Sequence, residues 1–396
     1  MNMNEQMKES EESILHTYNR FPVVFEKGQG CYLYDSEGKE YLDFAAGIAV
    51  NSLGYHYPGY DEALKDQIDK LMHISNLYYN EPIIEAGAKL VKASKMSKAF
   101  FTNSGTEAIE GALKAAKKYA YVRDGHADHE IIAMNHSFHG RSIGALSVTG
   151  NAHYREPFEP LMGGVKFADF NDLESVKAQI TDKTCAIITE VVQGEGGIYP
   201  AKKEFLEGLR QICDEKDIML IFDEIQCGMG RTGHYFAWQA YGVQPDIMTC
   251  AKALGCGVPV GAFVLNEKAA KASLEPGDHG TTYGGNPFVC AAVSKVFDIY
   301  ENDKIIEHVQ EMTPYLEQKL DEIVAKHECA ATRRGMGFMQ GIVIQGRPVG
   351  EVVKAALAKG LLVISAGSDV LRIVPPLVIT KEHIDKMAAI LDECME

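Results

Sequence analysis

The fold is decided by the stretch Ile218-Met219-Leu220-Ile221-Phe222-Asp223-Glu224, a continuous apolar run that ends in two acidic residues. A strand that is apolar at every position, not at alternate ones, is buried on both faces. Further runs of this kind lie at residues 99–102, 131–134, 186–189, 247–250 and 262–265. Segments of helical spacing separate them, so the region from about 60 to 265 predicts an α/β fold with a mainly parallel sheet.

Length and charge restrict the kind of protein. The chain has 396 residues, with 39 Lys+Arg against 55 Asp+Glu and a net charge of −16. Its length exceeds what one hydrophobic core usually organises, so we expect two domains. The acidic surplus argues against binding to nucleic acid or to anionic membranes, although a few local cations can still bind small anions.

Cysteine usage and the ends of the chain predict a cytoplasmic protein. The nine cysteines include no C-x-x-C pair, so neither a disulfide framework nor a cysteine-based zinc site is indicated. The first fourteen residues are polar and acidic, unlike a signal peptide. No apolar stretch approaches the ~18 residues needed to span a bilayer.

The two ends of the chain predict a second domain. Short β-rich pieces between residues 23 and 44 surround the turn Asp35-Ser36-Glu37-Gly38 and predict a hairpin. The last hundred residues predict an α+β layout: helices near 288–301 and 303–326, strands near 338–344 and 371–374, and a final helix from about 381. We therefore expect an N-terminal segment, 1–55, that packs with a small C-terminal α+β domain, 291–396, and a large domain over 56–290.

Open α/β sheets bind ligands at the carboxyl ends of their strands, so the polar residues that end the apolar runs are the candidates. Ser104, Gly105 and Thr106 open a helix and present free backbone N–H groups suited to a phosphate, or serve only as a helix cap. The Asp223 carboxylate needs a partner, either a protonated ring nitrogen or a structural salt bridge. Desolvation would make the Lys252 amine nucleophilic, unless that side chain reaches solvent.

Three other motifs have weaker support. Residues 228–233 match G-x-G-x-x-G and suggest a dinucleotide site, but no small-residue helix start or downstream acidic residue accompanies them, which favours a plain Gly-rich loop. The histidines at 126, 129, 136 and 139 lack the carboxylate spacing of a metal site, and we expect no metal. Arg141 is suited to clamping a carboxylate, with a surface salt bridge as the alternative.

Taken together, the motifs resemble those of the class III pyridoxal-phosphate aminotransferases. FTNSGTEA, SFHGR, VQGEGG, FDEIQCGMGRTG, AKALG, TTYGGNP and LRIVPPL occur in the family's order over nearly the whole chain. Within the class, the sequence is most similar to the acetylornithine aminotransferases. The resemblance implies the fold-type-I architecture of pyridoxal-phosphate-dependent transferases, with a large domain and a smaller α+β domain.

The resemblance also implies the cofactor, pyridoxal 5′-phosphate, and the residues that hold it. Lys252 would carry the cofactor as a Schiff base and later move the proton of the substrate, and Asp223 would keep the ring nitrogen protonated. Gly105 and Thr106 would bind the phosphate. Phe138 would stack on the ring, and Gln226 would contact the ring hydroxyl. Thr282, with Thr281 beside it, would reach the site from a neighbouring subunit, which implies a homodimer with composite sites.

The resemblance also implies which residues bind the substrates: Arg141, Glu195, Arg372, Thr281 and Tyr18. Arg372 would receive the α-carboxylate of 2-oxoglutarate or glutamate, and Glu195 would pair with Arg372 when the donor's terminal amine is bound. The implied reaction moves the terminal amino group of N2-acetylornithine to 2-oxoglutarate, giving N-acetylglutamate 5-semialdehyde and glutamate, a step of arginine biosynthesis. Succinylornithine, succinyldiaminopimelate, ornithine and 4-aminobutyrate are the alternative donors.

Two positions depart from the patterns of relatives. Ornithine δ-aminotransferases carry a tyrosine where this sequence has Ile48, which favours an acylated donor with no free α-amino group. Relatives more often carry histidine at the position of Tyr55. Two other classes of function stay open: a nicotinamide-dependent oxidoreductase built on residues 228–233, and a pyridoxal-phosphate-binding sensor without turnover.

Overall fold

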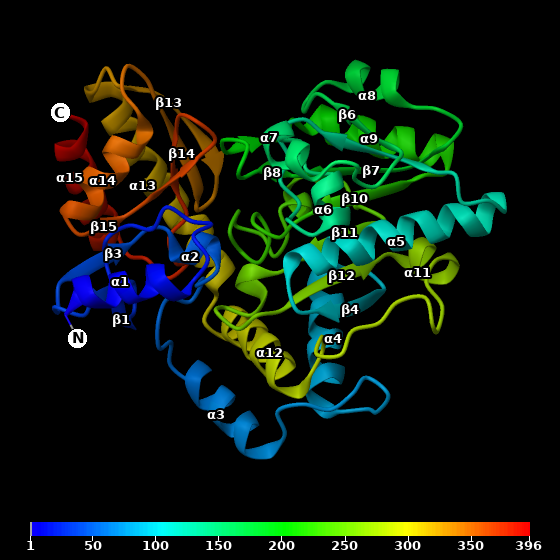
Figure 1. Cartoon of the computed structure of the whole chain (residues 1–396), viewed down its shortest axis with the longest axis horizontal. Coiled ribbons are helices and arrows are strands. Elements are labelled where there is room, and N and C mark those ends of the chain that lie inside the picture. Colours follow the sequence, from blue (N-terminus) through cyan, green and yellow to red (C-terminus); the bar gives the residue numbers. More distant parts are fainter. Residues whose placement is uncertain (1) are drawn as a thin grey trace.

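A computed structural model describes residues 2–396 (Figure 1). Its centre is a seven-stranded sheet of order β4-β12-β11-β10-β7-β5-β6. The strands are β4 (Lys98–Thr102), β5 (Glu130–Met134), β6 (Val165–Ala168), β7 (Thr184–Glu190), β10 (Met219–Asp223), β11 (Ile247–Cys250) and β12 (Gly261–Leu265). Only β12 runs antiparallel to its neighbours. The predicted α/β fold with a mainly parallel sheet is therefore confirmed, and all six apolar runs form strands.

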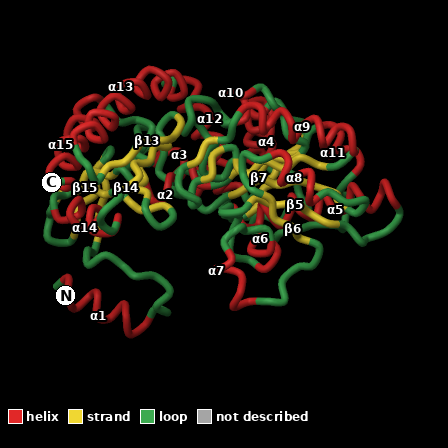
Figure 2. Tube along the Cα trace, turned by 90° about the horizontal axis from the view of Figure 1, so that it is seen from above, coloured by secondary structure: helices red, strands yellow, loops and turns green. Residues whose placement is uncertain are grey.

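Burial on both faces explains why those runs are apolar throughout. In β10, Met219 and Ile221 belong to the apolar cluster that contains the face of α5 (Gly105–Asp124), while Leu220 and Phe222 belong to the cluster on the other face. Helices lie on both sides of the strands (Figure 2). The remaining helices of this region are α3 (Tyr60–Lys70), α4 (Glu81–Ser94), α6 (Ile143–Ser147), α7 (Ala152–Arg155), α8 (Leu173–Gln179), α9 (Lys203–Lys216), α10 (Trp238–Tyr241) and α11 (Glu267–Ala272).

The edge strand β6 escaped prediction. Its sequence, Val-Lys-Phe-Ala, is short and interrupted by Lys166, and only Ala168 is fully buried. An edge strand has a neighbour on one side only, so it tolerates a charged residue that a central strand would exclude. Three-residue 3-10 helices at Glu156–Phe158 and Lys252–Leu254, and the small pair β8 (Val192–Gln193) and β9 (Tyr199–Pro200), complete this part of the chain.

The C-terminal region has the predicted α+β layout. Its helices are α12 (Pro287–Asn302), α13 (Ile305–Lys326), α14 (Val349–Ala358) and α15 (Lys381–Met395). A four-stranded sheet of order β13-β14-β17-β16 contains β13 (Ala330–Met336), β14 (Met339–Ile344), β16 (Ile364–Ala366) and β17 (Val370–Ile373). The sequence did not predict α14, β13 or β16, and β13 is largely polar, Ala-Ala-Thr-Arg-Arg-Gly-Met, because much of it is exposed.

The N-terminal residues form a further sheet that the C-terminal region completes. After α1 (Met3–Ser13) come β1 (Phe25–Gln29), β2 (Tyr32–Asp35), β3 (Glu40–Asp43) and α2 (Ala46–Ala49), and β15 (Leu361–Leu362) pairs with β3. The predicted hairpin is present as β2 and β3. Figure 1 shows β3 beside β15 of the C-terminal region, whereas α1 stands apart from that region in Figure 2. On this ground we propose that the segment 1–55 packs on the domain 291–396, with 56–290 as the large domain; the boundary at 290 lies within α12, which contacts α3 and α4. Within residues 2–396, no helix is long and apolar enough to cross a membrane.

Candidate active site

A cavity of about 500 Å³ lies at the carboxyl ends of the central strands. Segments that directly follow β4, β7, β10 and β11 contribute to its wall. It is lined by the predicted residues Gly105, Thr106, Phe138, Arg141, Asp223, Gln226 and Lys252. The strand ends thus bring together residues that are as far apart in the chain as 105 and 252.

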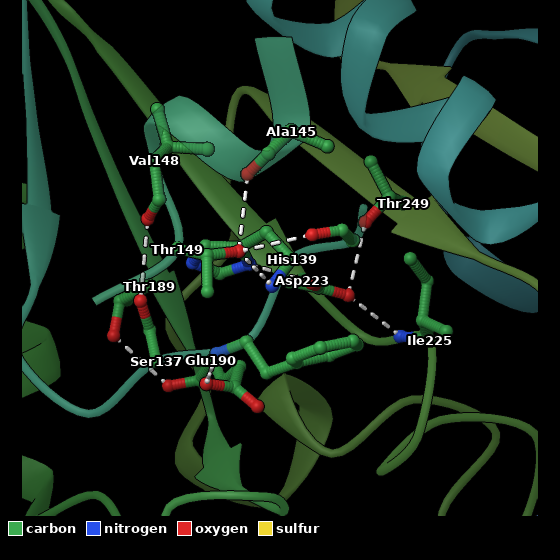
Figure 3. Close-up of polar contacts among 12 residues, drawn as sticks. Ser137, His139, Ala145, Val148, Thr149, Thr189, Glu190, Asp223, Ile225 and Thr249 are labelled. Carbon is green, nitrogen blue, oxygen red and sulfur yellow. Dashed lines mark hydrogen bonds and ion pairs between the residues drawn. The ribbon is translucent and has the colours of Figure 1, made fainter. Parts of the chain in front are cut away.

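Asp223 ends β10 as a buried carboxylate that accepts three hydrogen bonds (Figure 3). Its Oδ1 accepts from the backbone N–H of Ile225 at 3.0 Å and from the Thr249 hydroxyl at 3.2 Å. Its Oδ2 lies 2.7 Å from Nδ1 of His139, a ring that is 2% exposed. A carboxylate offers about four acceptor positions, so one remains for a donor in the cavity.

His139 is a residue of this site that spacing along the sequence did not indicate. Its backbone N–H donates to the Thr149 hydroxyl at 3.0 Å, which fixes the segment that carries the ring. Because a carboxylate only accepts hydrogen bonds, Nδ1 is the donor to Asp223. The His139 Nε2 is buried without a hydrogen-bond partner among residues 2–396. Only strand register could have indicated this pairing, because the two residues are 84 positions apart.

Glu190 is a second buried carboxylate at the cavity. It ends β7 and accepts from the backbone N–H groups of Phe138 at 3.3 Å and Gly194 at 3.2 Å. Burial, and then the nearby Asp223 charge, raise the pKa of Glu190 well above its ordinary value. The raised pKa favours the protonated form of Glu190 at the cavity.

Lys252 follows β11 at the cavity wall. Its backbone has a φ of +50°, a left-handed conformation that is uncommon for a residue with a side chain. Desolvation lowers the pKa of Lys252, against the opposing effect of Glu195. A lowered pKa leaves more of the amine neutral, which is the form that attacks a carbonyl and accepts a proton.

The N-terminus of α5 forms the opposite wall. Ser104 caps the helix through a hydrogen bond from the Glu107 backbone N–H at 3.3 Å. A Cβ at Gly105 would lie 2.9 Å from the Ile225 side chain, so glycine keeps the helix start close to the residues after β10. The Thr106 hydroxyl lies 2.7 Å from that of Ser142, which in turn donates to Glu110. This helix start has the backbone donors and dipole that favour an anion.

Arg372 on β17 forms an ion pair with Glu195, 177 residues away in the chain. The second contact, Nη2 to Oε2, is 3.2 Å, and Arg372 is 3% exposed. Gln226 bridges the pair: its Oε1 accepts from Arg372 at 3.1 Å and its Nε2 donates to Glu195 at 3.3 Å. Burial raises and Arg372 lowers the pKa of Glu195, and the net shift is downward, so the pair stays ionised.

Arg141 presents its guanidinium at the cavity above two aromatic rings. It lies 3.8 Å from the ring centre of Tyr154 and 5.4 Å from that of Phe138. Among residues 2–396, no carboxylate forms an ion pair with Arg141, so the guanidinium remains available to an anion. A second cavity of about 1000 Å³, lined by Phe138, Tyr154 and Glu195, lies next to it.

Five predicted residues do not line the main cavity: Glu195 and Arg372, which form the ion pair described above, and Thr281, Thr282 and Tyr18. Thr281 accepts a hydrogen bond from Asn103, a cavity residue of the same chain, at 3.2 Å. Thr282 is exposed, and Tyr18 is 72% exposed; neither lines the cavity within this chain. Their predicted roles in binding therefore stay predictions.

The Gly-rich stretch 228–233 is a buried loop, and the next helix, α10, starts only at Trp238. Arg231 in this loop donates to the Pro375 carbonyl oxygen, so the loop packs against the C-terminal region. It has no helix N-terminus for a dinucleotide phosphate, as the sequence indicated. Asp124, His126 and His129 come close enough together to hold a metal ion, but Arg123 already binds both carboxylate oxygens of Asp124 at 2.6 Å.

Comparison with known proteins agrees with this chemistry. The family model described as "Aminotransferase class-III" matches residues 14–395. The chain belongs to the class III aminotransferases. This class III aminotransferase is 47% identical over 388 residues to an acetylornithine aminotransferase of Clostridium acetobutylicum, covering 98% of this chain and 100% of that one.

Two other relatives are named for amino donors other than acetylornithine. A succinylornithine transaminase of Yersinia pseudotuberculosis is 44% identical, over 94% of this chain and 92% of its own. The crystal structure of the ornithine aminotransferase from Toxoplasma gondii superimposes with a TM-score of 0.95 at 28% identity, over 100% of this chain and 95% of that one. The same enzyme has also been described with partial occupancy of pyridoxal phosphate at its active site.

Pyridoxal phosphate is the cofactor of class III aminotransferases, and the residues of the cavity fit it. The start of α5 offers backbone N–H groups to a phosphate, and the free acceptor position of Asp223 suits a protonated ring nitrogen. That protonated nitrogen would also supply a positive charge near the buried Asp223 and Glu190, which both line the cavity. Lys252 lines the same cavity with an amine of lowered pKa.

Proposed function

We propose that this aminotransferase moves the terminal amino group of N2-acetylornithine to 2-oxoglutarate, producing N-acetylglutamate 5-semialdehyde and glutamate. The observation that carries the proposal is the Arg372–Glu195 ion pair, bridged by Gln226 beside the cavity of Lys252. A terminal amine arrives without a neighbouring carboxylate, whereas 2-oxoglutarate presents one. An arginine that Glu195 can mask or release serves both substrates.

The identity of the donor rests on separate support. Ile48, at the position of a tyrosine in ornithine δ-aminotransferases, offers no polar group to a free α-amino end. The chain is 47% identical to the Clostridium acetobutylicum acetylornithine aminotransferase, against 28% to the Toxoplasma gondii ornithine enzyme. The relative at 44% identity that is named for succinylornithine makes N2-succinylornithine the second candidate.

Different residues of the chain have different roles in this reaction. When bound, pyridoxal phosphate supplies an aldehyde that joins to amines and a ring that withdraws electrons. The Nζ of Lys252 takes the proton from the substrate carbon that bears the amino group and later returns a proton. Asp223, fixed by His139 and Thr249, holds the proton on the ring nitrogen. Arg141 binds the donor's α-carboxylate and the distal carboxylate of glutamate.

A panel of donors tests the proposal. We expect the rate of the first half-reaction, followed by the loss of the cofactor's yellow absorbance, to be highest with N2-acetylornithine. Ornithine should react at least about tenfold more slowly, because Ile48 offers no hydrogen-bond partner to its charged α-amino group. Ornithine reacting as fast as N2-acetylornithine would contradict the choice of donor, and a donor-independent lack of reaction would favour a sensor.

The switch itself predicts an asymmetric defect in Glu195→Gln. Glutamine cannot neutralise Arg372, so the buried guanidinium stays unpaired when the donor's terminal amine is bound. We expect the half-reaction with N2-acetylornithine to slow by about 10- to 100-fold, while the half-reaction with glutamate changes little. Single-turnover measurements of both half-reactions check this. Equal effects on the two would exclude a switch.

We further propose a cytoplasmic homodimer with composite sites. Exposed apolar side chains gather on and before α4 and on the loop that carries Thr282: Leu77, Tyr78, Tyr79, Ile84 and Tyr283. The Asn76 side chain donates to the Gly284 carbonyl oxygen at 2.8 Å, so the two segments are neighbours. Covering such a surface with a second copy would bury it and bring Thr282 towards the partner's cavity. Sedimentation equilibrium measures the mass of the assembly.

A further inference from the structure

The segment between β3 and α3 contains a strained turn beside the main cavity. Ala46, Gly47, Ile48 and Ala49 all have left-handed backbone conformations, with φ of 48°, 63°, 66° and 62°. Left-handed geometry is unfavourable for residues with a side chain, and more so for a β-branched residue such as Ile48. A run of four therefore persists only where its surroundings hold it.

The Asp43 carboxylate holds the start of this turn. Its Oδ1 accepts from the backbone N–H groups of Ala45 at 2.9 Å and Ala46 at 2.8 Å. Asp43 is 1% exposed and burial raises its pKa, so the carboxylate needs further donors to stay in place. No lysine, arginine or histidine forms an ion pair with it within residues 2–396.

Tyr55 supplies the missing donor. Its hydroxyl donates to Oδ2 of Asp43 at 2.8 Å and accepts from Nδ2 of Asn51 at 3.2 Å. The fold makes room for this ring, because a Cβ at Gly28 would lie 2.4 Å from the Tyr55 ring. Tyr55 also pairs with Gly30 through two backbone hydrogen bonds of 2.8 and 2.9 Å. Gly30 directly follows β1, so this pairing fixes the backbone of Tyr55 next to the N-terminal sheet.

The turn ends at the cavity and at the loop that follows Lys252. Val50 lines the cavity, and the Asn51 side chain lies against Gly257, another lining residue. The Leu53 backbone N–H donates to the sulfur of Cys256 in the same loop. A displacement of the turn would thus be transmitted both to the cavity wall and to the Lys252 loop.

The same segment contacts the chain that follows Arg372. The backbone N–H of Val374 donates to the Phe44 carbonyl oxygen at 2.9 Å, and that of Leu377 to the Ser52 carbonyl oxygen at 2.6 Å. Residues 44–53 therefore connect the strand that carries Arg372 with the loop that carries Lys252. Rigid placement of such a connection matters, because a misplacement of about 1 Å can cost 100-fold in rate.

We propose that Tyr55 and Asp43 are positioning residues: together they hold the left-handed turn 46–49 and thereby set the cavity wall at Val50 and the Lys252 loop at Gly257. The pair acts through these neighbours and touches no reacting atom. The inference depends on the proposed function only for its kinetic readout.

The chain offers a matched control for removing the Tyr55 hydroxyl. Tyr41 donates to Oδ2 of Asp35 at 3.0 Å, with both side chains buried, in the same N-terminal sheet. The Asp35 carboxylate accepts from backbone N–H groups of the β2–β3 turn and not from residues 46–49. Tyr41→Phe and Tyr55→Phe therefore delete the same kind of hydrogen bond, and only the second is tied to the strained turn.

The first readout is amide hydrogen exchange of residues 44–53 in the cofactor-loaded enzyme. We expect Tyr55→Phe to speed exchange there by about tenfold, and Tyr41→Phe to leave that segment unchanged. Unchanged exchange in Tyr55→Phe would overturn the proposal. If Tyr55→Phe gave too little folded protein, Asp43→Asn would carry the same test with the same expected result.

The second readout is kinetic. We expect kcat/KM of Tyr55→Phe to fall about tenfold for both N2-acetylornithine and glutamate, mainly through KM, and that of Tyr41→Phe to change by less than about twofold. Equal kinetic effects of the two phenylalanine variants would overturn the proposal. If N2-acetylornithine were not the donor, the unmodified enzyme would also fail to react with it, whereas the glutamate measurement and the exchange result would still test the proposal.

Discussion

Lys252→Ala will lower the rate of transamination by at least about 10⁴-fold, the largest effect expected of any single substitution in this enzyme. The amine lines the cavity with a lowered pKa, because desolvation disfavours its charged form. No other lysine lines the cavity within residues 2–396, so no side chain nearby can take over the proton transfer. Steady-state rates with N2-acetylornithine and 2-oxoglutarate measure the loss.

A second lysine provides the control for this prediction. Lys268 pairs with Asp217 at 2.7 Å, away from the cavity, and Lys268→Ala should keep its activity within about twofold. Borohydride treatment followed by peptide mass spectrometry gives an independent readout. In the unmodified enzyme the cofactor's mass should be found on the peptide that contains Lys252. Its attachment to another lysine, or activity retained in Lys252→Ala, would contradict the assignment.

Asp223→Asn is expected to reduce activity by about 10²- to 10³-fold, the second largest effect. Asparagine has nearly the same shape as aspartate, so the segment around Thr249 and Ile225 should keep its structure. The change removes the negative charge that holds a proton on the ring nitrogen, and the neutral amide leaves His139 with a poorer acceptor. The rate of the donor half-reaction and the absorbance spectrum of the bound cofactor both report the loss.

The next residue, Glu224, is the control for this prediction, because it is a buried carboxylate that does not line the cavity. Glu224 is also buried, but its oxygens accept from the backbone N–H groups of Ala237 and Trp238, each at 2.8 Å, outside the cavity. Glu224→Gln should therefore retain activity within a few fold. Similar losses in Asp223→Asn and Glu224→Gln would indicate a structural role for Asp223.

The same control has a pH signature. Burial raises the pKa of Glu224 to about 7. A raised pKa favours the protonated carboxyl in the folded state, so this contribution to stability is complete below the ordinary pKa and disappears as the pH rises through about 7. Glu224→Gln should remove that dependence, which thermal unfolding at several pH values would detect.

Much of the fold was predictable because its determinants are local. A central strand of a parallel sheet is buried on both faces, so a run such as residues 218–222 is apolar throughout and can be identified without knowing its neighbours. Edge strands such as β6 and polar strands such as β13 lack that signal, because solvent covers part of each. Helix α14 was also missed by the sequence prediction.

The candidate site was predictable to the extent that its residues end strands or belong to family motifs. Asp223 and Lys252 directly follow apolar runs, and Arg141 belongs to SFHGR. His139, Glu190 and Thr249 did not receive roles. Their importance depends on which strands are neighbours and in what register, and no single segment contains that information.

By itself, the sequence determined six of the seven strands of the central sheet, the edge at which ligands bind and, through its motifs, the class of enzyme. The strands and the binding edge depend on the hydrophobicity of each segment and on the need of its backbone to form hydrogen bonds. Both are local properties of a segment. Only the tertiary structure decided other pairings of distant groups: His139 with Asp223, and Tyr55 with Asp43 beneath the left-handed turn. The physical reason is that charged and polar side chains interact strongly only when they are buried within hydrogen-bonding distance, and the closure of the whole chain sets that distance.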